Sequence, residues 1–145
     1  MYTIEIVTAI LLLFIAVIVI QTFSHYFLIE EFETRPIYAQ WFIIRGMIFI
    51  FHATLFQLMD IYQYIPIFCW QGSAHFIIFN PLLNKLRSLK KENRGKLLYH
   101  FWYVGLDSGW LDKLFVKDRN FHRWFYFGCC FIFVVSSIVI YDTYV

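Results

Sequence analysis

The chain has 145 residues and a formal net charge of +2, and 61% of its residues are hydrophobic while only 15% are charged. A soluble domain usually has about 45–50% apolar and about 25% charged residues, so this composition excludes an ordinary soluble domain. The length fits one small unit rather than two domains.

The N-terminal segment predicts a membrane-spanning helix over about residues 4–28. Its centre, from Ile10 to Ile20, has no polar side chain, and about 20 predominantly apolar residues are enough to cross the hydrocarbon core of a bilayer. The leader before this run contains neither Lys nor Arg, which a cleaved signal peptide would need. We therefore expect a retained anchor, followed by a short polar link that ends at Pro36.

Two further spans are predicted over about 41–59 and 64–83, and the few residues between them favour an antiparallel hairpin. Trp41 is typical of an interfacial anchor, and Arg45 lies one turn further in, where its long side chain can reach the membrane surface. The third span contains several polar residues, whose cost in lipid is acceptable only if they face other helices. These residues are Gln71, Gly72, Ser73, His75, Asn80 and Pro81.

A basic loop, residues 84–123, precedes the fourth predicted span at about 124–141. Near an anionic leaflet each cation contributes on the order of 1 kcal/mol, so the orientation of the chain in the membrane is enough to explain the basic run. In the alternative interpretation, the loop binds lipid headgroups or a cytoplasmic partner. Within the loop, residues 97–116 predict an amphipathic helix lying in the membrane interface, in which Ser108 caps a helical turn containing Asp112. The cations concerned are Lys85, Arg87, Lys90, Lys91, Arg94 and Lys96.

The distribution of charge supports four spans. With four spans, residues 29–40 and 84–123, together with Arg45 at their border, hold all 12 Lys and Arg residues. The opposite side holds Glu5, Asp60 and Asp142 and no basic residue. The positive-inside rule then places the basic segments in the cytoplasm and both termini outside it. The predicted fold is all-α, an integral membrane four-helix bundle with one cytoplasmic interfacial helix.

Two histidines suggest a cofactor site. His52 and His75 are predicted to lie at similar depth near the midplane on the two helices of the hairpin. Facing imidazoles can hold a haem iron or another metal, or relay protons. In the alternative interpretation each histidine hydrogen-bonds a neighbouring helix, with Gln21, Gln57 or Gln71 as its partner. The sequence has no CxxC, CxxCH or other metal-ligand motif.

Polar residues within the spans predict helix–helix contacts. A polar stripe can line a water-filled path, or it can join one helix to a neighbour or to another subunit. We expect contacts of the second kind from Gln21, His25, Gln57, Gln71, Asn80 and Asn84.

Enzymatic function has little support in the sequence. There is no GxSxG, no HExxH and no phosphate-binding Gly-rich loop. Arg94 and His100 have the spacing of the active-site pair in HEPN ribonucleases, but that site needs a soluble helical bundle. A lipid-modifying site formed by His100, Asp107 and Asp112 has no further motif behind it. We expect no catalytic residue and no nucleic-acid partner.

Two segments carry a resemblance to a known group of proteins. Residues Phe76 to Arg87 end an apolar helix in Asn80-Pro81-Leu82-Leu83-Asn84-Lys85, and Tyr103 to Phe115 contain Tyr-Val-Gly, then Ser108, an aromatic residue and Asp112-Lys113. This pattern resembles small uncharacterised multi-span membrane proteins of Bacteroidetes bacteria and their phages. The resemblance implies a bacterial inner-membrane location and a conformational role for Gly105, Ser108 and Asp112.

Three functional hypotheses follow from these features. The first is a non-enzymatic membrane protein that assembles with itself or serves as an accessory subunit of a larger membrane complex. The second is a holin-like pore or channel of phage origin, and the third is a haem- or metal-binding electron carrier that uses His52 and His75. The first explains the polar helix faces without requiring a cofactor.

Overall fold

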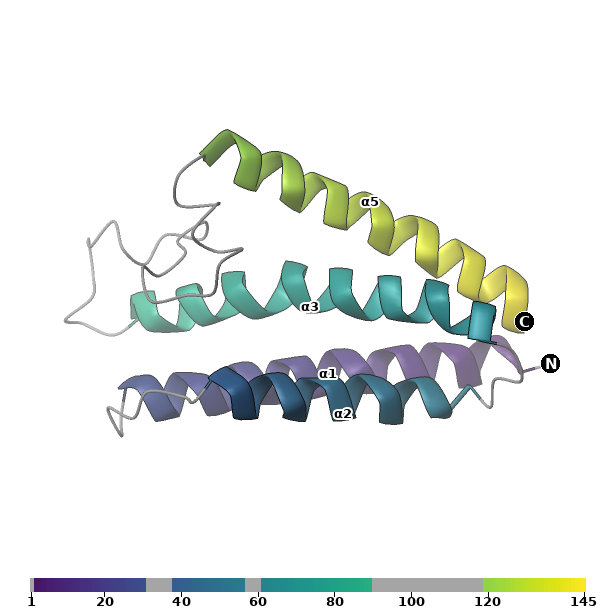
Figure 1. Ribbon diagram of the computed structural model, residues 1–145, viewed down its shortest axis with the longest axis horizontal. Helices are drawn as coiled ribbons and strands as arrows, with labels where there is room; N and C mark the ends of the chain where they lie inside the picture. The colour runs from purple at the N-terminus through teal and green to yellow at the C-terminus, as the bar shows by residue number, and fades with distance from the viewer. Residues whose placement is uncertain (1, 31–37, 57–60, 90–118) are drawn as a thin grey trace.

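The computed structural model describes residues 2–30, 38–56, 61–89 and 119–145, and it is all-helical over these ranges (Figure 1). Four helices are defined: α1 (Ile4–Glu30), α2 (Tyr38–Thr54), α3 (Ile61–Leu89) and α5 (Arg119–Tyr144). The prediction of an all-α fold is therefore confirmed for this part of the chain. The predicted interfacial helix at 97–116 lies outside the described residues.

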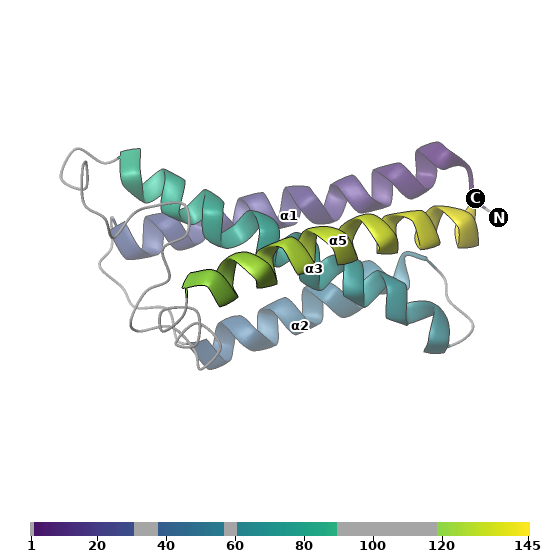
Figure 2. The same cartoon turned by 90° about the horizontal axis from the view of Figure 1, so that it is seen from above.

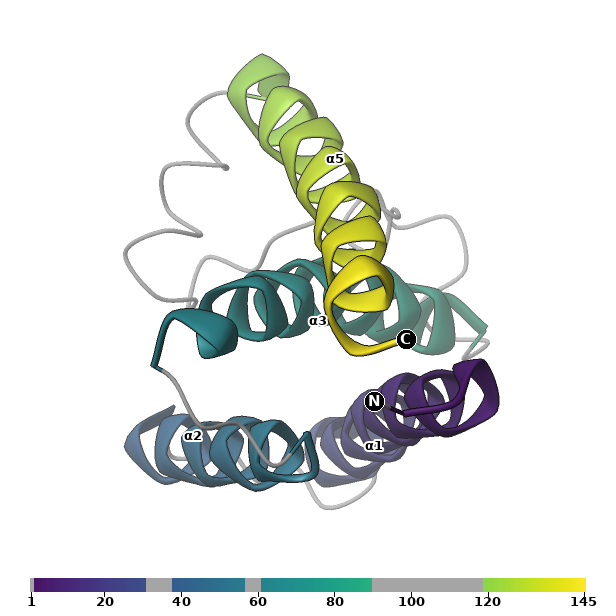
Figure 3. The same ribbon diagram turned by 90° about the vertical axis from the view of Figure 1, so that its right-hand side faces the viewer.

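The helices form three layers. Viewed from the end of the molecule, α1 and α2 lie next to each other in one layer, α3 lies over both, and α5 lies on the far side of α3 (Figure 3). From above, α3 runs diagonally from the end of α2 to the end of α1 (Figure 2). Most of the packing is between α3 and α5 and between α1 and α3, whereas α2 contacts α3 much less. Helix α3 is therefore the centre of the fold.

Successive helices alternate in direction, which makes α1 parallel to α3 and antiparallel to α2 and α5 (Figure 1). Both chain termini consequently lie at the same end of the molecule. There the backbone N–H of Tyr2 donates a hydrogen bond of 2.8 Å to the carbonyl oxygen of Tyr144.

The core is built from one face of α1 against α3 and α5. Val7, Leu11, Phe14 and Ile18 are spaced by three or four residues, so they lie on one side of the helix and are all buried. They meet buried residues of α3, of the end of α2 and of the last turns of α5. The largest of these buried partners are Phe56, Ile67, Trp70 and Ile140.

The observed helix bounds differ from the predicted spans mostly at the ends. Helix α2 ends at Thr54, before the predicted 59, in a tight turn closed by the N–H groups of Leu55 and Phe56 bonding the carbonyls three residues back. Helix α3 continues to Leu89 although Pro66 and Pro81 lie inside it. Helix α5 starts at Arg119 and extends to Tyr144, beyond 124–141 on both sides.

Two helices, α1 over Ile4–Leu28 and α5 over Asn120–Tyr144, are long and apolar enough to cross a membrane. Only 33% and 17% of their most apolar windows are buried in the molecule, so neither resembles the buried core helix of a soluble protein. The apolar part of α2, Ile43–Thr54, is shorter. Large apolar side chains face outward on all four helices, for example Leu12, Met47, Ile65 and Phe131.

Basic side chains lie toward one end of the bundle, where Lys85 and Arg87 occupy the last turns of α3 and Arg123 lies near the start of α5. Glu30, the last residue of α1, lies at the same end, and Arg45 lies near the middle of α2. The acidic residues Glu5 and Asp142 lie at the other end, beside the termini.

Candidate functional site

A buried histidine joins three helices through hydrogen bonds. His52, on α2, hydrogen-bonds the carbonyl oxygen of Ile10 on α1 through Nε2 at 2.8 Å. Its Nδ1 lies 2.7 Å from Nε2 of Gln71 on α3. The same amide nitrogen donates to the carbonyl oxygen of Phe49 at 3.0 Å. We call this set of four residues the His52 network.

The geometry of the His52 network fixes the protonation of the imidazole. The two amide hydrogens of Gln71 point at the Phe49 carbonyl and at Nδ1 of His52, so Nδ1 accepts a hydrogen bond. Nε2 then carries the proton and donates it to the Ile10 carbonyl. Rotating the Gln71 amide would place its oxygen against the Phe49 carbonyl oxygen. These partners favour a neutral His52 with its proton on Nε2, and they leave Oε1 of Gln71 buried without a partner among the described residues.

Both backbone acceptors in this network are carbonyls inside helices. The Ile10 oxygen and the Phe49 oxygen each have a second lone pair that an intrahelical bond leaves available. Aromatic rings surround the imidazole: Phe14 lies 4.7 Å away between ring centroids, and Trp70 is stacked at 6.3 Å. The network therefore lies in an apolar environment that excludes competing water, where a satisfied hydrogen bond holds helices in register.

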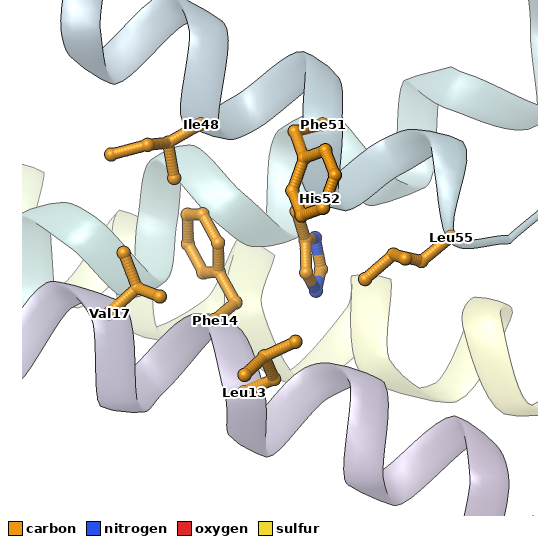
Figure 4. A pocket seen from close by; sticks show the side chains of 7 residues that line it. All are labelled: Leu13, Phe14, Val17, Ile48, Phe51, His52 and Leu55. Atoms are coloured by element: carbon orange, nitrogen blue, oxygen red, sulfur yellow. The ribbon is translucent and has the colours of Figure 1, made fainter.

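A cavity of about 120 Å³ lies beside the His52 network, between α1 and α2 (Figure 4). Its walls are apolar except for the imidazole, and both nitrogens of that ring are already in hydrogen bonds. The cavity therefore offers space and apolar contact but no open polar group. Its lining residues are Leu13, Phe14, Val17, Ile48, Phe51, His52 and Leu55.

A second group of polar side chains gathers around the ring of Phe79. His75 stacks on this ring at 4.9 Å, His25 meets it edge-on at 5.1 Å, and the guanidinium carbon of Arg45 lies 4.5 Å from its centroid. These residues come from α1, α2 and α3. Together with Gln21 we call them the Arg45 cluster.

The register of the parallel helices α1 and α3 explains why Gln21 belongs to this cluster. His25 contacts Phe79, and Gln21 and His75 each lie four residues earlier on their helices, hence at the same level. The side chain of Gln21 is 8% exposed. Its amide Nε2 and the Nδ1 of His75 are buried with no hydrogen-bond partner among the described residues.

Three further hydrogen bonds tie α5 to the other helices. The indole N–H of Trp70 donates to the hydroxyl of Ser137 at 2.9 Å, and that hydroxyl donates to the Phe133 carbonyl. The hydroxyls of Thr8 and Tyr141 lie 2.8 Å apart. The Tyr144 hydroxyl donates to the carbonyl of Gln63 at 3.2 Å. None of these pairs was expected from the sequence, because each joins residues at least 67 positions apart.

The structure does not bring the predicted histidine pair together. His52 binds Ile10 and Gln71, while His75 lies one turn beyond Gln71 and contacts Phe49 and Phe79. No ring contact joins these two described imidazoles. Binding of an iron between them would first require the His52 network to open, because neither nitrogen of His52 is open to a metal.

The other predicted site residues divide into two sets. Asn84 is buried and Asn80 is half-buried on α3, where Lys85 is exposed and Arg87 half-buried. The remaining predicted positions lie outside the described residues: Gln57, Lys90, Lys91, Arg94, Lys96, Gly105, Ser108 and Asp112.

Within the described ranges, no three His, Cys, Asp or Glu side chains gather as they would around a metal ion. Cys69 is exposed and Cys129 buried, and each is a free thiol. No protein-family model, curated protein or solved structure matches the chain.

Proposed function

We propose that the chain is an integral membrane protein with four spans that acts without catalysis, by assembling with itself or as an accessory subunit of a larger membrane complex. The observation that carries this proposal is the distribution of side chains, which is apolar on the outer surface and includes hydrogen-bonded polar groups between the helices. Large apolar side chains cover the outside of all four helices, while His52, Gln71 and Trp70 are buried and bonded between helices.

This distribution is what a lipid environment requires. In hydrocarbon, apolar side chains can face outward at no cost, whereas polar side chains must find partners on other helices. Helix α2, with 17 residues, is about 26 Å long and α3, with 29, about 44 Å. Helix α2 would need only slight local thinning of a hydrocarbon core of about 30 Å. Helix α3 is long enough to cross that core and both headgroup regions, which together measure about 40–45 Å.

The separation of charge supports an orientation. Lys85, Arg87 and Arg123 share one end of the bundle, as the positive-inside rule expects of a cytoplasmic face. The termini would then lie outside the cytoplasm. The resemblance to membrane proteins of Bacteroidetes and their phages supports the bacterial inner membrane as the location.

Assembly explains the structure better than a pore does. A pore would need polar side chains that line water, but both ring nitrogens of His52 and the amide nitrogen of Gln71 are hydrogen-bonded within one chain. Helix α5, in contrast, packs on one side only and leaves a broad apolar face, including Trp124, Phe127 and Phe131, outside the bundle. Such a face suits contact with other membrane helices or with lipid.

The test combines membrane extraction with measurement of mass. We expect the full chain to stay in the membrane fraction after alkaline carbonate treatment, and to form a particle of several copies, or one with stoichiometric partners, in mild detergent by light scattering. Release by carbonate would refute the membrane location. A strictly monomeric particle, with no crosslinked partner in native membranes, would refute assembly. Dye leakage on expression would favour the pore instead.

Orientation is tested with single cysteines in a background lacking Cys69, Cys129 and Cys130. Thr143 and Lys85 are exposed at opposite ends of the bundle. We expect Thr143→Cys to react with an impermeant maleimide added outside intact cells, and Lys85→Cys to react only after the cells are opened. The reverse pattern would invert the proposed orientation.

A further inference from the structure

We infer that the cavity between α1 and α2 is a binding site for the end of an acyl chain from a phospholipid of the surrounding bilayer. This inference rests on the membrane location proposed above, and it gives a ligand to a space that the proposed assembly does not use. The cavity has a volume of about 120 Å³, and its lining side chains come from α1, α2 and the turn that follows α2 (Figure 4).

The cavity has a buried base and an exposed rim. Phe14 and His52, at its base, are buried, whereas the rim residues Leu13 and Phe51 are 50% and 66% exposed. The cavity is therefore open to the outer surface of the bundle, where apolar side chains face lipid in the proposed location. A chain end can enter from that surface without passing through the core.

The cavity exists because α1 and α2 are held apart. Each of them packs on α3, and few of their backbone positions come close to each other along the described residues. The ring of Phe14 spans the distance, since its centroid lies 5.2 Å from that of Phe49 and 4.7 Å from that of His52. The cavity is the space beside this ring that no described side chain fills.

The chemistry of the walls selects a hydrocarbon. Both ring nitrogens of His52 already have hydrogen-bond partners, and the other lining side chains are apolar. A bound water needs about two to four polar partners, whereas an apolar cavity of about 150 Å³ stays dry and takes up benzene. This slightly smaller cavity therefore suits a chain segment of about five carbons. Such a segment restores the dispersion contacts that an empty space loses.

The depth of the cavity favours a chain end over a headgroup. Val17 is the middle residue of α1, and Leu13 lies about one turn before it. Because the hydrocarbon core is about 30 Å thick, the middle of a spanning helix lies about 15 Å from either headgroup region. Acyl chains end at this depth. The absence of a charged residue among those lining the cavity agrees with a ligand that is hydrocarbon only.

The experiment maps where chain ends contact the full chain in vesicles of phosphatidylcholine. The probe is a phosphatidylcholine with a photoreactive diazirine at the end of one acyl chain, and labelled residues are identified by peptide mass spectrometry. Phe131, near the middle of α5, is the internal reference, because it is 69% exposed and does not line the cavity. We expect Phe51 to be labelled about threefold more than Phe131, because a chain held in the cavity stays beside it.

Matched substitutions test whether the cavity itself is responsible. Leu13 lines the cavity and Leu12 does not, although both are exposed leucines of α1. Leu13→Trp should fill the cavity and lower the labelling of Phe51 to the level of Phe131, and Val17→Phe should act in the same way from the next turn of the same wall. Leu12→Trp should leave the preference unchanged. A preference that survives both filling substitutions would overturn the proposal.

The remaining outcomes separate the occupants and the two proposals. A phosphatidylglycerol with the same chain-end diazirine should label Phe51 equally, and a strong dependence on the headgroup would refute a site for the chain alone. Labelling of Phe51 below that of Phe131 would show that protein, such as a second copy, covers the cavity, and would overturn the lipid as its occupant. Release of the chain by carbonate would refute the membrane location and this inference with it. Carbonate resistance together with equal labelling of Phe51 and Phe131 would refute the cavity site alone.

Discussion

The hydrogen bond between Gln71 and His52 should be measurable as a coupling energy. Gln71→Leu removes two hydrogen bonds, one to His52 and one to the Phe49 carbonyl, without a large change in volume. Hydrogen bonds between membrane helices average about 0.6 kcal/mol and reach about 1.7 kcal/mol. The substitution should therefore lower the free energy of unfolding by about 1–3 kcal/mol.

His52→Phe provides the second variant of the cycle. It removes the bond to the Ile10 carbonyl and the same bond to Gln71, while the aromatic ring still packs on Phe14. Because both single variants lose the shared bond, the double variant should lose less than their sum. The difference should be about 0.6–1.7 kcal/mol, the value of one interhelical hydrogen bond.

The assay is reversible unfolding in mixed micelles with increasing dodecyl sulfate, followed by tryptophan fluorescence. Ser73→Ala is the matched control, since Ser73 is buried on the same helix and its hydroxyl, among the described residues, bonds only the Trp70 carbonyl within α3. It should change stability little. A coupling below about 0.3–0.5 kcal/mol, the usual departure from additivity between independent sites, would refute the view that this bond joins α2 to α3.

Three other substitutions or reactions test the packing. Phe14→Ala should lower the free energy of unfolding by about 3 kcal/mol in the same assay, because it opens a cavity in the core. Leu12→Ala, on the outer face of α1, should lower it little. Equal losses would contradict the described core. In detergent, N-ethylmaleimide should modify exposed Cys69 before buried Cys129, as followed by peptide mass spectrometry, and the reverse order would contradict their burial. Gly128→Ala should leave the free energy of unfolding unchanged or raise it, since no described atom lies within 4 Å of the added methyl group; a clear loss would contradict open space at this position.

The existence of the four helices could be predicted from the sequence because each has a long apolar stretch. The start of α1 at Ile4 was predicted correctly, since the composition changes sharply there. The ends of α2 and α3 could not be predicted from apolarity. Helix α3 continues through Asn84 and Lys85 to Leu89, where polar side chains follow the apolar run while the backbone hydrogen bonds persist.

The partner of His52 was only partly predictable. Gln71 was one of three glutamines proposed as a partner, and the structure places it there. The other acceptor, the Ile10 carbonyl, has no sequence signal, because every residue carries a carbonyl. His75 was expected to meet His52 from depth alone, but depth does not specify which face of a helix a residue occupies.

The contacts of the Arg45 cluster also could not be predicted from the sequence. Arg45 was expected to extend to the membrane surface, as long cations near helix ends usually do. Instead its guanidinium lies over Phe79, between helices. The contact depends on how α1, α2 and α3 converge, and this convergence depends on the packing of all three helices. The charge of Arg45 was evident from the sequence, but its aromatic partner was not.

The backbone hydrogen bond between Tyr2 and Tyr144 holds the two ends of the chain side by side. Because these ends lie next to each other, a short peptide joining them would strain neither α1 nor α5. A new opening between Glu30 and Tyr38 would then give a circularly permuted protein whose ends lie on the basic side. Reporter domains fused to the two versions would sit on opposite sides of the same membrane, although the helices and their contacts would be unchanged.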